Sequence, residues 1–433
     1  MNYQATMPEL PGLPLDDLIL PDRVHTRLYI DPAIYAEEMA QIFHKSWLFI
    51  GHASEIPKPG DFRLRTMGTQ PVIFVRDQGG KVRVLLNRCT HRANAVCSQE
   101  RGNTPGFTCS YHGWRFRLDG ELAAVPYSDR YDESFDKSVL GLTPVPRIGE
   151  HRGFVFASLS SDGISLDEHF GPLVKQELDD IADLSPEGEL DMTAGYHQMR
   201  YAGNWKLIIE NAIDGYHANF AHRAYFEAVK RRTGNDPSPL GSSSSPAKVH
   251  SIGMGHGTWD SRSLAQGTKT YAASFEGEAG KAYLAALHKA HGKERAEYVL
   301  AKQSSHLFIF PNFSYTGAHC RQFRPMAVDR TQFTLFPIML KGVPDAVNEA
   351  RLRAHERFYG PSALGGQSDD LEVFERNQIG LNAQVEPWSL LTRGRHLEQQ
   401  EPDGSISNQI TDELSNRAFW ARYKLEMQRG GAA

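Results

Sequence analysis

Two short stretches decide how this chain of 433 residues is organised: Cys89-Thr90-His91 and, 17 residues further on, Cys109-Ser110-Tyr111-His112. They place one Cys–His pair on each of two segments, separated by about one β-hairpin of chain. Two thiolates and two imidazoles are the ligands of a structural zinc site. The same four groups also suit a [2Fe–2S] cluster in which both cysteines bind one iron and both histidines bind the other.

The residues around the two pairs favour the iron–sulfur cluster. Arg92 follows the first histidine and Gly113-Trp114 follow the second, so the patterns read C-x-H-R and C-x-Y-H-G-W. These two motifs resemble those that bind a Rieske cluster, in which two imidazole ligands raise the reduction potential of the cluster. We therefore predict that the cluster is bound by four residues: Cys89, His91, Cys109 and His112. A zinc-stabilised binding module is the alternative.

A second group of possible metal ligands follows downstream. Asp214, His217 and His222 form the pattern D-x2-H-x4-H. Two histidines with a distant carboxylate make a facial triad for Fe(II), which leaves positions open for O2 and a substrate. Asp214 and His217 are three residues apart and would share a helix face, whereas His217 and His222 cannot share one in a regular α-helix. We therefore expect the helix to bulge or end between residues 218 and 221. Surface histidines on an ordinary helix are the alternative reading.

Together these motifs resemble the large (alpha) subunit of Rieske non-haem iron aromatic-ring-hydroxylating oxygenases. The resemblance covers nearly the whole chain. Besides the two metal motifs, the stretches that match the family are Trp47…Gly51-His52, Pro59-Gly60-Asp61-Phe62, the N-W-K…E-N block from Asn204, Gly360-Pro361 and Asp369-Asp370-Leu371-Glu372. It implies that Asp370, the second residue of the D-D pair, completes the iron site with His217 and His222. Asp369 is then a neighbour and not a ligand, and a solvated acidic turn is the alternative for the pair.

The resemblance also implies a role for Asp214 that spacing cannot show. This carboxylate does not bind iron but bridges, by hydrogen bonds, from His217 to a cluster ligand, His112, of a neighbouring subunit. Carboxylates commonly orient ligand imidazoles in this way. The implied assembly is a ring of three alpha subunits, in many members with a small beta subunit as α3β3.

The implied activity is that of the terminal oxygenase component of a multicomponent dioxygenase. Its cofactors are the [2Fe–2S] Rieske cluster and a mononuclear Fe(II), and its electrons come from NAD(P)H through a separate reductase, ferredoxin or both. No G-x-G-x-x-G follows a predicted strand, so we expect no fused reductase. The stretch from Arg321 to Pro325 and the segment D-D-L-E-V-F-E from Asp369 look most like branches that act on aromatic acids such as benzoate, salicylate or cumate. This resemblance favours cis-dihydroxylation of an aromatic carboxylate. Ring monohydroxylation, demethylation and dioxygenation of neutral (poly)aromatic hydrocarbons are the alternatives.

Arginine side chains would suit a carboxylate by bidentate pairing. Arg321 and Arg324 lie on a predicted strand and point to opposite faces, so at most one can face the pocket. For each of them alone, we favour a role as a sheet-surface or interface charge.

Composition indicates an ordinary soluble protein, with 40% hydrophobic and 23% charged residues and a net charge of −5. We find no basic patch for nucleic acid, no apolar run that could span a bilayer and no signal-peptide pattern in the first 20 residues. With two of the 4 cysteines in the cluster, no disulfide framework is expected. These features predict a cytoplasmic protein without nucleic-acid or membrane partners.

The expected fold class is α+β. Residues 1–44 would form an arm and a helix of the catalytic domain, with Asp31-Pro32 at the helix start. An all-β Rieske domain at 45–162 is inserted next, because strand patterns such as 72–75 and 82–86 flank a Gly-Gly turn. Residues 163–433 would form the catalytic domain, a curved antiparallel sheet wrapped around helices.

Overall fold

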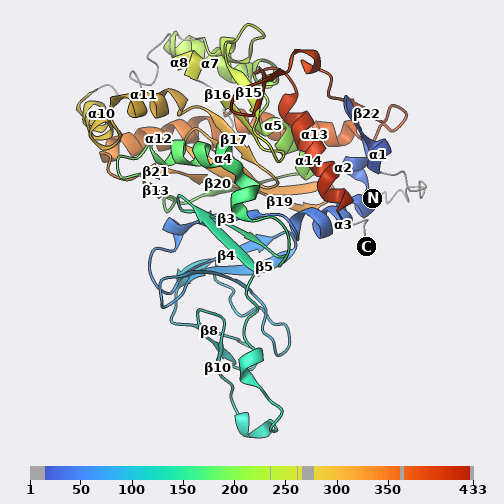
Figure 1. Ribbon diagram of the computed structural model, residues 1–433, viewed down its shortest axis with the longest axis vertical. Helices are drawn as coiled ribbons and strands as arrows, with labels where there is room; N and C mark the ends of the chain where they lie inside the picture. The colour runs from blue at the N-terminus through green and yellow to red at the C-terminus, as the bar shows by residue number, and fades with distance from the viewer. Residues whose placement is uncertain (1–14, 235, 261, 266–276, 361–364, 430–433) are drawn as a thin grey trace.

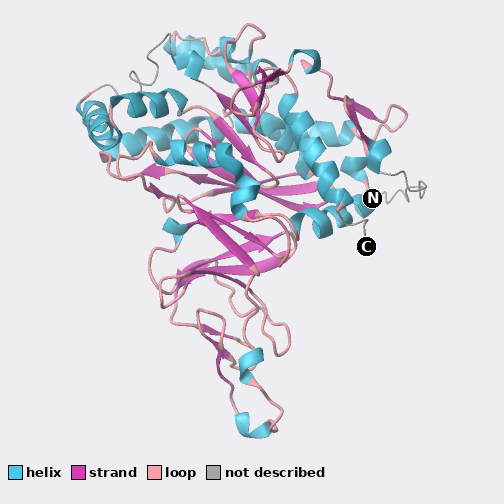
Figure 2. Ribbon diagram, in the orientation of Figure 1, coloured by secondary structure: helices cyan, strands magenta, loops and turns pink. Residues whose placement is uncertain are grey.

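The computed structural model describes residues 15–234, 236–260, 262–265, 277–360 and 365–429. One end of the molecule is narrow and consists mostly of strands and loops, and most helices gather at the broad end (Figure 1 and Figure 2). The start of the predicted arm and Pro361 lie outside the described residues. No described helix has the length and apolar character needed to cross a bilayer.

The predicted all-β region consists of three small antiparallel sheets. Their strand orders are β6-β5-β4-β7, β11-β12-β3 and β10-β9-β8, and the predicted hairpin is β5 paired with β6. The strands are β3 (Leu48–His52), β4 (Asp61–Met67), β5 (Gln70–Arg76), β6 (Val82–Leu86), β7 (Arg101–Asn103), β8 (Phe107–Thr108), β9 (Arg115–Phe116), β10 (Leu122–Ala124), β11 (Arg147–His151) and β12 (Phe154–Ser158).

The broad end is built on a nine-stranded antiparallel sheet of order β14-β20-β19-β18-β17-β16-β15-β24-β23. Its strands are β14 (His197–Tyr201), β15 (Lys248–Ser251), β16 (Gly257–Asp260), β17 (His306–Ile309), β18 (Phe313–Thr316), β19 (His319–Ala327), β20 (Arg330–Pro337), β23 (Gln399–Gln400) and β24 (Ile406–Gln409). Two minor sheets pair β1 (Ile19–Leu20) and β2 (Arg23–His25) with β22 (Trp388–Leu390), and β13 (Leu190–Asp191) with β21 (Met339–Leu340).

Helices α5, α13 and α14 lie on the side of this sheet away from β4 and β5 (Figure 1). The helices are α1 (Leu15–Leu18), α2 (Arg27–Ile30), α3 (Pro32–Glu38), α4 (Leu166–Ala182), α5 (Trp205–Ala212), α6 (Ala218–Ala221), α7 (Arg223–Thr233), α8 (Arg262–Ala265), α10 (Glu278–His291), α11 (Lys293–Lys302), α12 (Asp345–Tyr359), α13 (Gly366–Gly380) and α14 (Leu414–Gln428). The α+β class is confirmed.

The N-terminal segment packs against the broad end. Asp31 caps α3 by accepting the N–H of Ala33, as predicted. At the end of α3, the buried Glu38 carboxylate forms an ion pair with Lys206 and accepts hydrogen bonds from Trp205 Nε1 and Tyr423 Oη, both at 2.7 Å. Because Lys206 is on α5 and Tyr423 on α14, this network joins three segments far apart in the sequence.

Three hydrophobic clusters divide the all-β region, and two of them continue into the broad end. Phe49 on β3 packs edge-on against Phe313 of the nine-stranded sheet, with ring centroids 4.8 Å apart, so this part shares a core with the broad end. The narrow end has its own small core, which contains Cys89 and Cys109. The two cysteines are therefore held by packing that belongs to the narrow end alone.

Candidate metal centres

Two loops of the same shape carry the Cys–His pairs at the narrow end. The first follows β6 and the second joins β8 to β9. In each loop the cysteine N–H donates to the carbonyl five residues ahead, and the cysteine carbonyl accepts the N–H four residues ahead, with distances of 2.8–3.0 Å. Each turn needs a left-handed residue, Ala93 (φ 60°) in the first loop and Gly113 (φ 72°) in the second. The repeated turn holds the two cysteines in the same way, whereas His91 stands two residues after its cysteine and His112 three residues after its own.

The loops bring the four predicted cluster ligands together. Cys89 and Cys109 are each 1% exposed, and Nδ1 of His91 lies 3.1 Å from Nδ1 of His112. Two nitrogens bound to one tetrahedral metal at about 2.1 Å would lie about 3.4 Å apart, so the observed spacing fits a shared ion. Burial opposes ionisation of the Cys109 thiol, but backbone N–H groups, first that of Tyr111, lower its pKa. Two buried sulfurs and two outward imidazoles therefore fit the Rieske ligand set.

The histidine edge of this site faces solvent. His91 stacks on Trp114 with ring centroids 4.9 Å apart, and His112 stacks on Tyr111 at 3.8 Å. The Tyr111 side chain is 59% exposed. An electron can therefore enter or leave through the imidazole side without crossing the protein core.

The second group of ligands lies at a break in the helices of the broad end. Helix α5 ends at Ala212, and Asp214 and His217 lie in the turn before α6. His222 stands between α6 and α7. The predicted shared helix face for Asp214 and His217 is therefore wrong, and so is the predicted break at 218–221, because those residues form α6 itself. A close approach explains the turn, since a Cβ on Gly215 would lie only 2.7 Å from Ile410.

Helix α13 brings Asp370 to the two histidines. Asp370 Oδ1 lies 3.3 Å from Nε2 of His222 and 3.7 Å from Nε2 of His217, and the three ligand atoms lie within 4.8 Å of one another. The Asn211 amide lies 3.3 Å from the same carboxylate oxygen. Burial raises the pKa of Asp370, and the two imidazoles oppose that rise. A buried carboxylate facing two ring nitrogens is the donor set that Fe(II) takes in a facial triad.

A carboxylate stands behind each of these histidines. Asp214 Oδ2 lies 2.8 Å from Nδ1 of His217, and Asp369 Oδ2 lies 3.4 Å from Nδ1 of His222. Such partners fix the orientation of a ligand imidazole and increase its basicity. The two carboxylates therefore hold both Nε2 atoms toward Asp370.

The described residues contain another pair of histidines with a carboxylate, His197, His355 and Glu356. Here the carboxylate is 47% exposed and is already bonded to His197 Nε2 at 2.6 Å. Both ring nitrogens of His355 lack a partner among the described residues, so no carboxylate orients that ring. This group lacks the supporting contacts that distinguish the site at Asp370.

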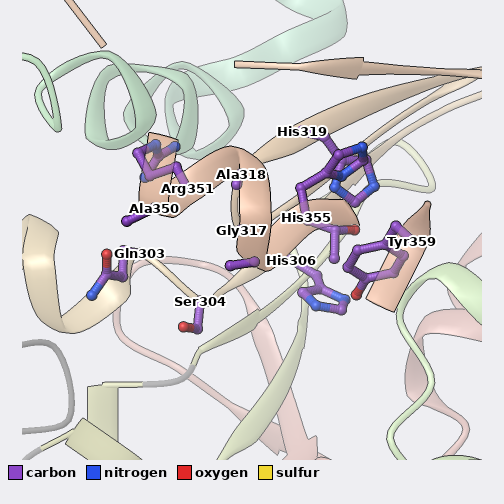
Figure 3. Close-up of a pocket in the computed structure, with 12 residues that line it drawn as sticks. Gln303, Ser304, His306, Gly317, Ala318, His319, Ala350, Arg351, His355 and Tyr359 are labelled. Atoms are coloured by element: carbon purple, nitrogen blue, oxygen red, sulfur yellow. The ribbon is translucent and has the colours of Figure 1, made fainter. Parts of the chain in front are cut away.

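A cavity of about 350 Å³ lies between α12 and the strands β17 to β19 (Figure 3). His306 and Tyr359 line this cavity and lie within electrostatic range of His217 and Asp370, respectively, so the cavity adjoins the iron-site residues. Burial lowers the pKa of His306 to about 3, so its ring is neutral. The sequence did not identify Tyr359 as a cavity residue, since nothing in a local pattern marks the last turn of α12.

The two arginines considered from the sequence do lie on opposite faces of β19. Arg321 is buried, donates from Nε to His319 at 3.0 Å and packs its guanidinium 4.8 Å from the Tyr359 ring centre. Arg324 lines a separate cavity beside β4. The expectation of a surface or interface charge is wrong for Arg321.

Comparison with known proteins identifies the class. Residues 46–144 match the Rieske [2Fe-2S] domain, and residues 190–423 match the ring hydroxylating alpha subunit (catalytic domain). The chain is 32% identical over 388 residues to the 2-halobenzoate 1,2-dioxygenase large subunit of Burkholderia cepacia, with 86% of this chain and 80% of that protein covered. It is 32% identical over 378 residues to the toluate 1,2-dioxygenase subunit alpha of Pseudomonas putida, with 83% and 79% covered.

The fold agrees with this match. A structure of naphthalene 1,2-dioxygenase from Rhodococcus sp. bound to indole superimposes with a TM-score of 0.80 at 25% identity, covering 94% of each chain. The protein thus belongs to the ring-hydroxylating oxygenase alpha subunits, in the aromatic-acid branch. It is an oxidoreductase that carries a Rieske [2Fe–2S] cluster and a mononuclear iron.

Proposed function

We propose that this chain is the terminal oxygenase subunit that adds O2 to the ring of an aromatic carboxylate to give a cis-diol. The observation that carries the proposal is the His217–His222–Asp370 group, which lies within electrostatic range of His306 and Tyr359 in the lining of a cavity of about 350 Å³. A cavity of that size accepts a small aromatic molecule. The similarity to large subunits that are named for halobenzoate and toluate supports a carboxylate substrate.

In this proposal Cys89 and Cys109 hold one iron of the cluster, and His91 and His112 hold the other. His217, His222 and Asp370 hold the mononuclear iron. Bound there, iron supplies the activation of O2, and the cluster supplies electrons one at a time. The protein orients the ligands, positions the ring and excludes water from the buried carboxylate.

Asp214 is proposed as the positioning residue that links the two centres. It holds Nδ1 of His217 at 2.8 Å and remains 24% exposed, so it can also meet a group from outside the chain. The cluster loops lie at the narrow end, far from α5 and α13 (Figure 1). One chain therefore does not bring its own centres together, which supports a ring of three alpha subunits in which His112 of one meets Asp214 of the next.

The subunit composition, the electron donors and the domain boundaries are part of the same proposal. We infer an α3β3 complex in the cytoplasm, which receives electrons from NAD(P)H through a reductase, a ferredoxin or both. The proposed division is an arm at 1–44, a Rieske domain at 45–162 and a catalytic domain at 163–433. The Glu38–Lys206 pair supports the assignment of the arm to the catalytic domain.

Reconstituted turnover tests the activity. The purified oxygenase with a reductase and ferredoxin is supplied with benzoate, 4-methylbenzoate, 2-chlorobenzoate, toluene and chlorobenzene, and products are identified by mass spectrometry. The proposal expects cis-diols from the acids in preference to the hydrocarbons. Diols from the hydrocarbons alone would support a dioxygenase of neutral aromatics, and phenols or demethylated products alone would support a monooxygenase.

A further inference from the structure

Three side chains outside the iron site have the chemistry of a second metal site. His197 begins β14, the edge strand of the nine-stranded sheet, and His355 and Glu356 lie in the last two turns of α12. One donor atom of each residue, a ring nitrogen or a carboxylate oxygen, lies within 4.8 Å of the other two. Two imidazoles and a carboxylate are an established ligand set for Zn²⁺, with a solvent molecule as the fourth ligand.

His355 is the member of this group that lacks a partner. Its side chain is 2% exposed, and neither ring nitrogen has a hydrogen-bond partner among the described residues. Buried polar groups are nearly always bonded to protein, to water or to an ion. The buried His256, by comparison, is bonded through both of its ring nitrogens. Because a nitrogen of His355 lies close to the donor atoms of His197 and Glu356, an ion shared by the three would satisfy it.

The two imidazole rings are arranged as they would be around one ion. The ring centres of His197 and His355 are 5.7 Å apart, and their planes differ by 18°. Two imidazoles bound to one tetrahedral ion at about 2.1 Å have ring centres about 5 Å apart, so only a small shift is needed. The His217–His222 pair of the iron site has a similar separation of 5.1 Å.

Solvent and charge at this group also favour a cation. His197 is 28% exposed and Glu356 is 47% exposed, so an ion can enter from solvent. Burial lowers the pKa of His355 to about 4, so the ring is neutral and can act as a ligand at neutral pH. The positive charge of Arg321 acts on this ring, but the negative charge of Glu356 acts on it more strongly. Binding requires that His197 Nε2 give up the proton that it shares with Glu356.

We propose that His197, His355 and Glu356 bind Zn²⁺ at a site separate from the catalytic iron. No carboxylate orients His355 from behind, in contrast to the histidines of the iron site, so we expect an exchangeable ion and not a permanent one. The ion ties α12 to the edge strand β14. His355 also lines the cavity beside His319, with ring centres 4.7 Å apart (Figure 3), so Zn²⁺ fixes one wall of that cavity. This inference does not depend on the reaction that the enzyme catalyses.

Zinc binding to the untagged holoenzyme, with cluster and iron loaded, tests this site. Equilibrium dialysis against Zn²⁺, followed by metal analysis, is expected to show about one zinc ion per chain with no loss of iron. Glu356→Gln and His355→Asn should each raise the Kd for Zn²⁺ by more than about 100-fold, because losing even an outer partner of a metal ligand costs about 10- to 100-fold. Glu349→Gln changes another exposed and paired carboxylate of α12 and is the matched control, which should bind zinc as the wild type does.

His217→Ala separates this site from the iron site, because it removes an iron ligand and should still bind zinc. Three results would overturn the inference: no zinc uptake by the wild type, unchanged zinc binding in Glu356→Gln, or loss of zinc binding in His217→Ala, which would place the ion at the iron site. Cluster absorption shows that each variant is folded. Glu356 lies at the surface, so Glu356→Gln keeps the test decisive even if His355→Asn does not fold.

Discussion

The Asp214 carboxylate lies 2.8 Å from Nδ1 of His217 and turns the Nε2 atom of that ring toward Asp370. Asp369 stands in the same relation to His222, but at 3.4 Å. The two histidines are thus held by different carboxylates, one in the turn after α5 and one on α13. This difference allows the orienting role and the proposed electron-transfer role of Asp214 to be separated by matched variants.

Replacing Asp214 is expected to slow turnover strongly and to leave both metals bound. In Asp214→Ala, His217 keeps its Nε2 atom for iron, but the proposed bridge to the neighbouring subunit is lost. We expect turnover to fall by about 100-fold, at the upper end of the effect of losing a carboxylate behind a metal ligand. The rate of cluster reoxidation after rapid mixing with O2 and substrate measures the transfer step.

Asp369→Asn is the control for that variant. It weakens the support of His222 only, so a loss of about 10-fold that added Fe(II) restores is expected. If the cluster of Asp214→Ala is reoxidised at the wild-type rate, Asp214 has no role in electron transfer. If the cluster is reoxidised slowly in both variants, Asp214 only orients His217.

His217→Ala should remove the mononuclear iron and leave the cluster spectrum intact, because the cluster has its own core at the narrow end. His197→Ala should keep full iron, since Glu356 and His197 already bond to each other. Iron analysis together with visible absorption measures both outcomes. Full iron in His217→Ala, or its loss in His197→Ala, would contradict the assignment of the site.

Lys206→Met should destabilise the protein by about 3–5 kcal/mol, because it leaves the buried Glu38 carboxylate without its cation. Adding Glu38→Gln should recover most of this loss, since the amide oxygen can still accept from Trp205 Nε1 and the amide NH2 can donate to the Tyr423 hydroxyl. Urea midpoints of the three proteins give the comparison. A Lys206→Met protein as stable as the wild type would show that the network does not hold the N-terminal segment in place.

Acid should destabilise the fold through His256. Its Nδ1 accepts the Phe310 N–H at 3.0 Å and its Nε2–H donates to the His169 carbonyl at 2.7 Å, so the neutral ring is fully bonded. Burial lowers its pKa to about 4. The unfolded chain therefore binds the extra proton first, and stability falls as pH drops from about 6.5 to 4, by up to about 3 kcal/mol.

Unfolding midpoints of wild type and His256→Asn between pH 7.5 and 4.5 measure this effect. The variant has no titrating ring at this position, so its midpoint should decline less steeply toward low pH. Parallel curves for the two proteins would exclude His256 as a source of the acid sensitivity.

Short-range spacing predicts the two Cys–His pairs and the two iron-site histidines, because the members of each pair are at most five residues apart in the sequence. Asp370 lies 148 residues beyond His222, and only its D-D pair and the family resemblance point to it. The spacing of His217 and His222 excludes a regular helix but does not say where it breaks. That place depends on the contact of Gly215 with Ile410, which comes from a distant strand end.

The cavity residues were not predictable for the same reason. Arg351 belongs to a helix segment with Arg353 and Arg357, which looks like a charged surface in the sequence. Packing of α12 decides that Arg351 is buried while Arg353 is exposed. Strand alternation, in contrast, correctly placed Arg321 and Arg324 on opposite faces, because it needs only the local backbone.

A single turnover of the reduced holoprotein with 4-methylbenzoate under ¹⁸O₂ tests the central claim most directly. The account predicts a cis-diol that carries two ¹⁸O atoms, formed by the wild type and absent from His217→Ala. A product with one ¹⁸O atom, or no oxidised product from a protein that holds both its cluster and its mononuclear iron, would contradict it.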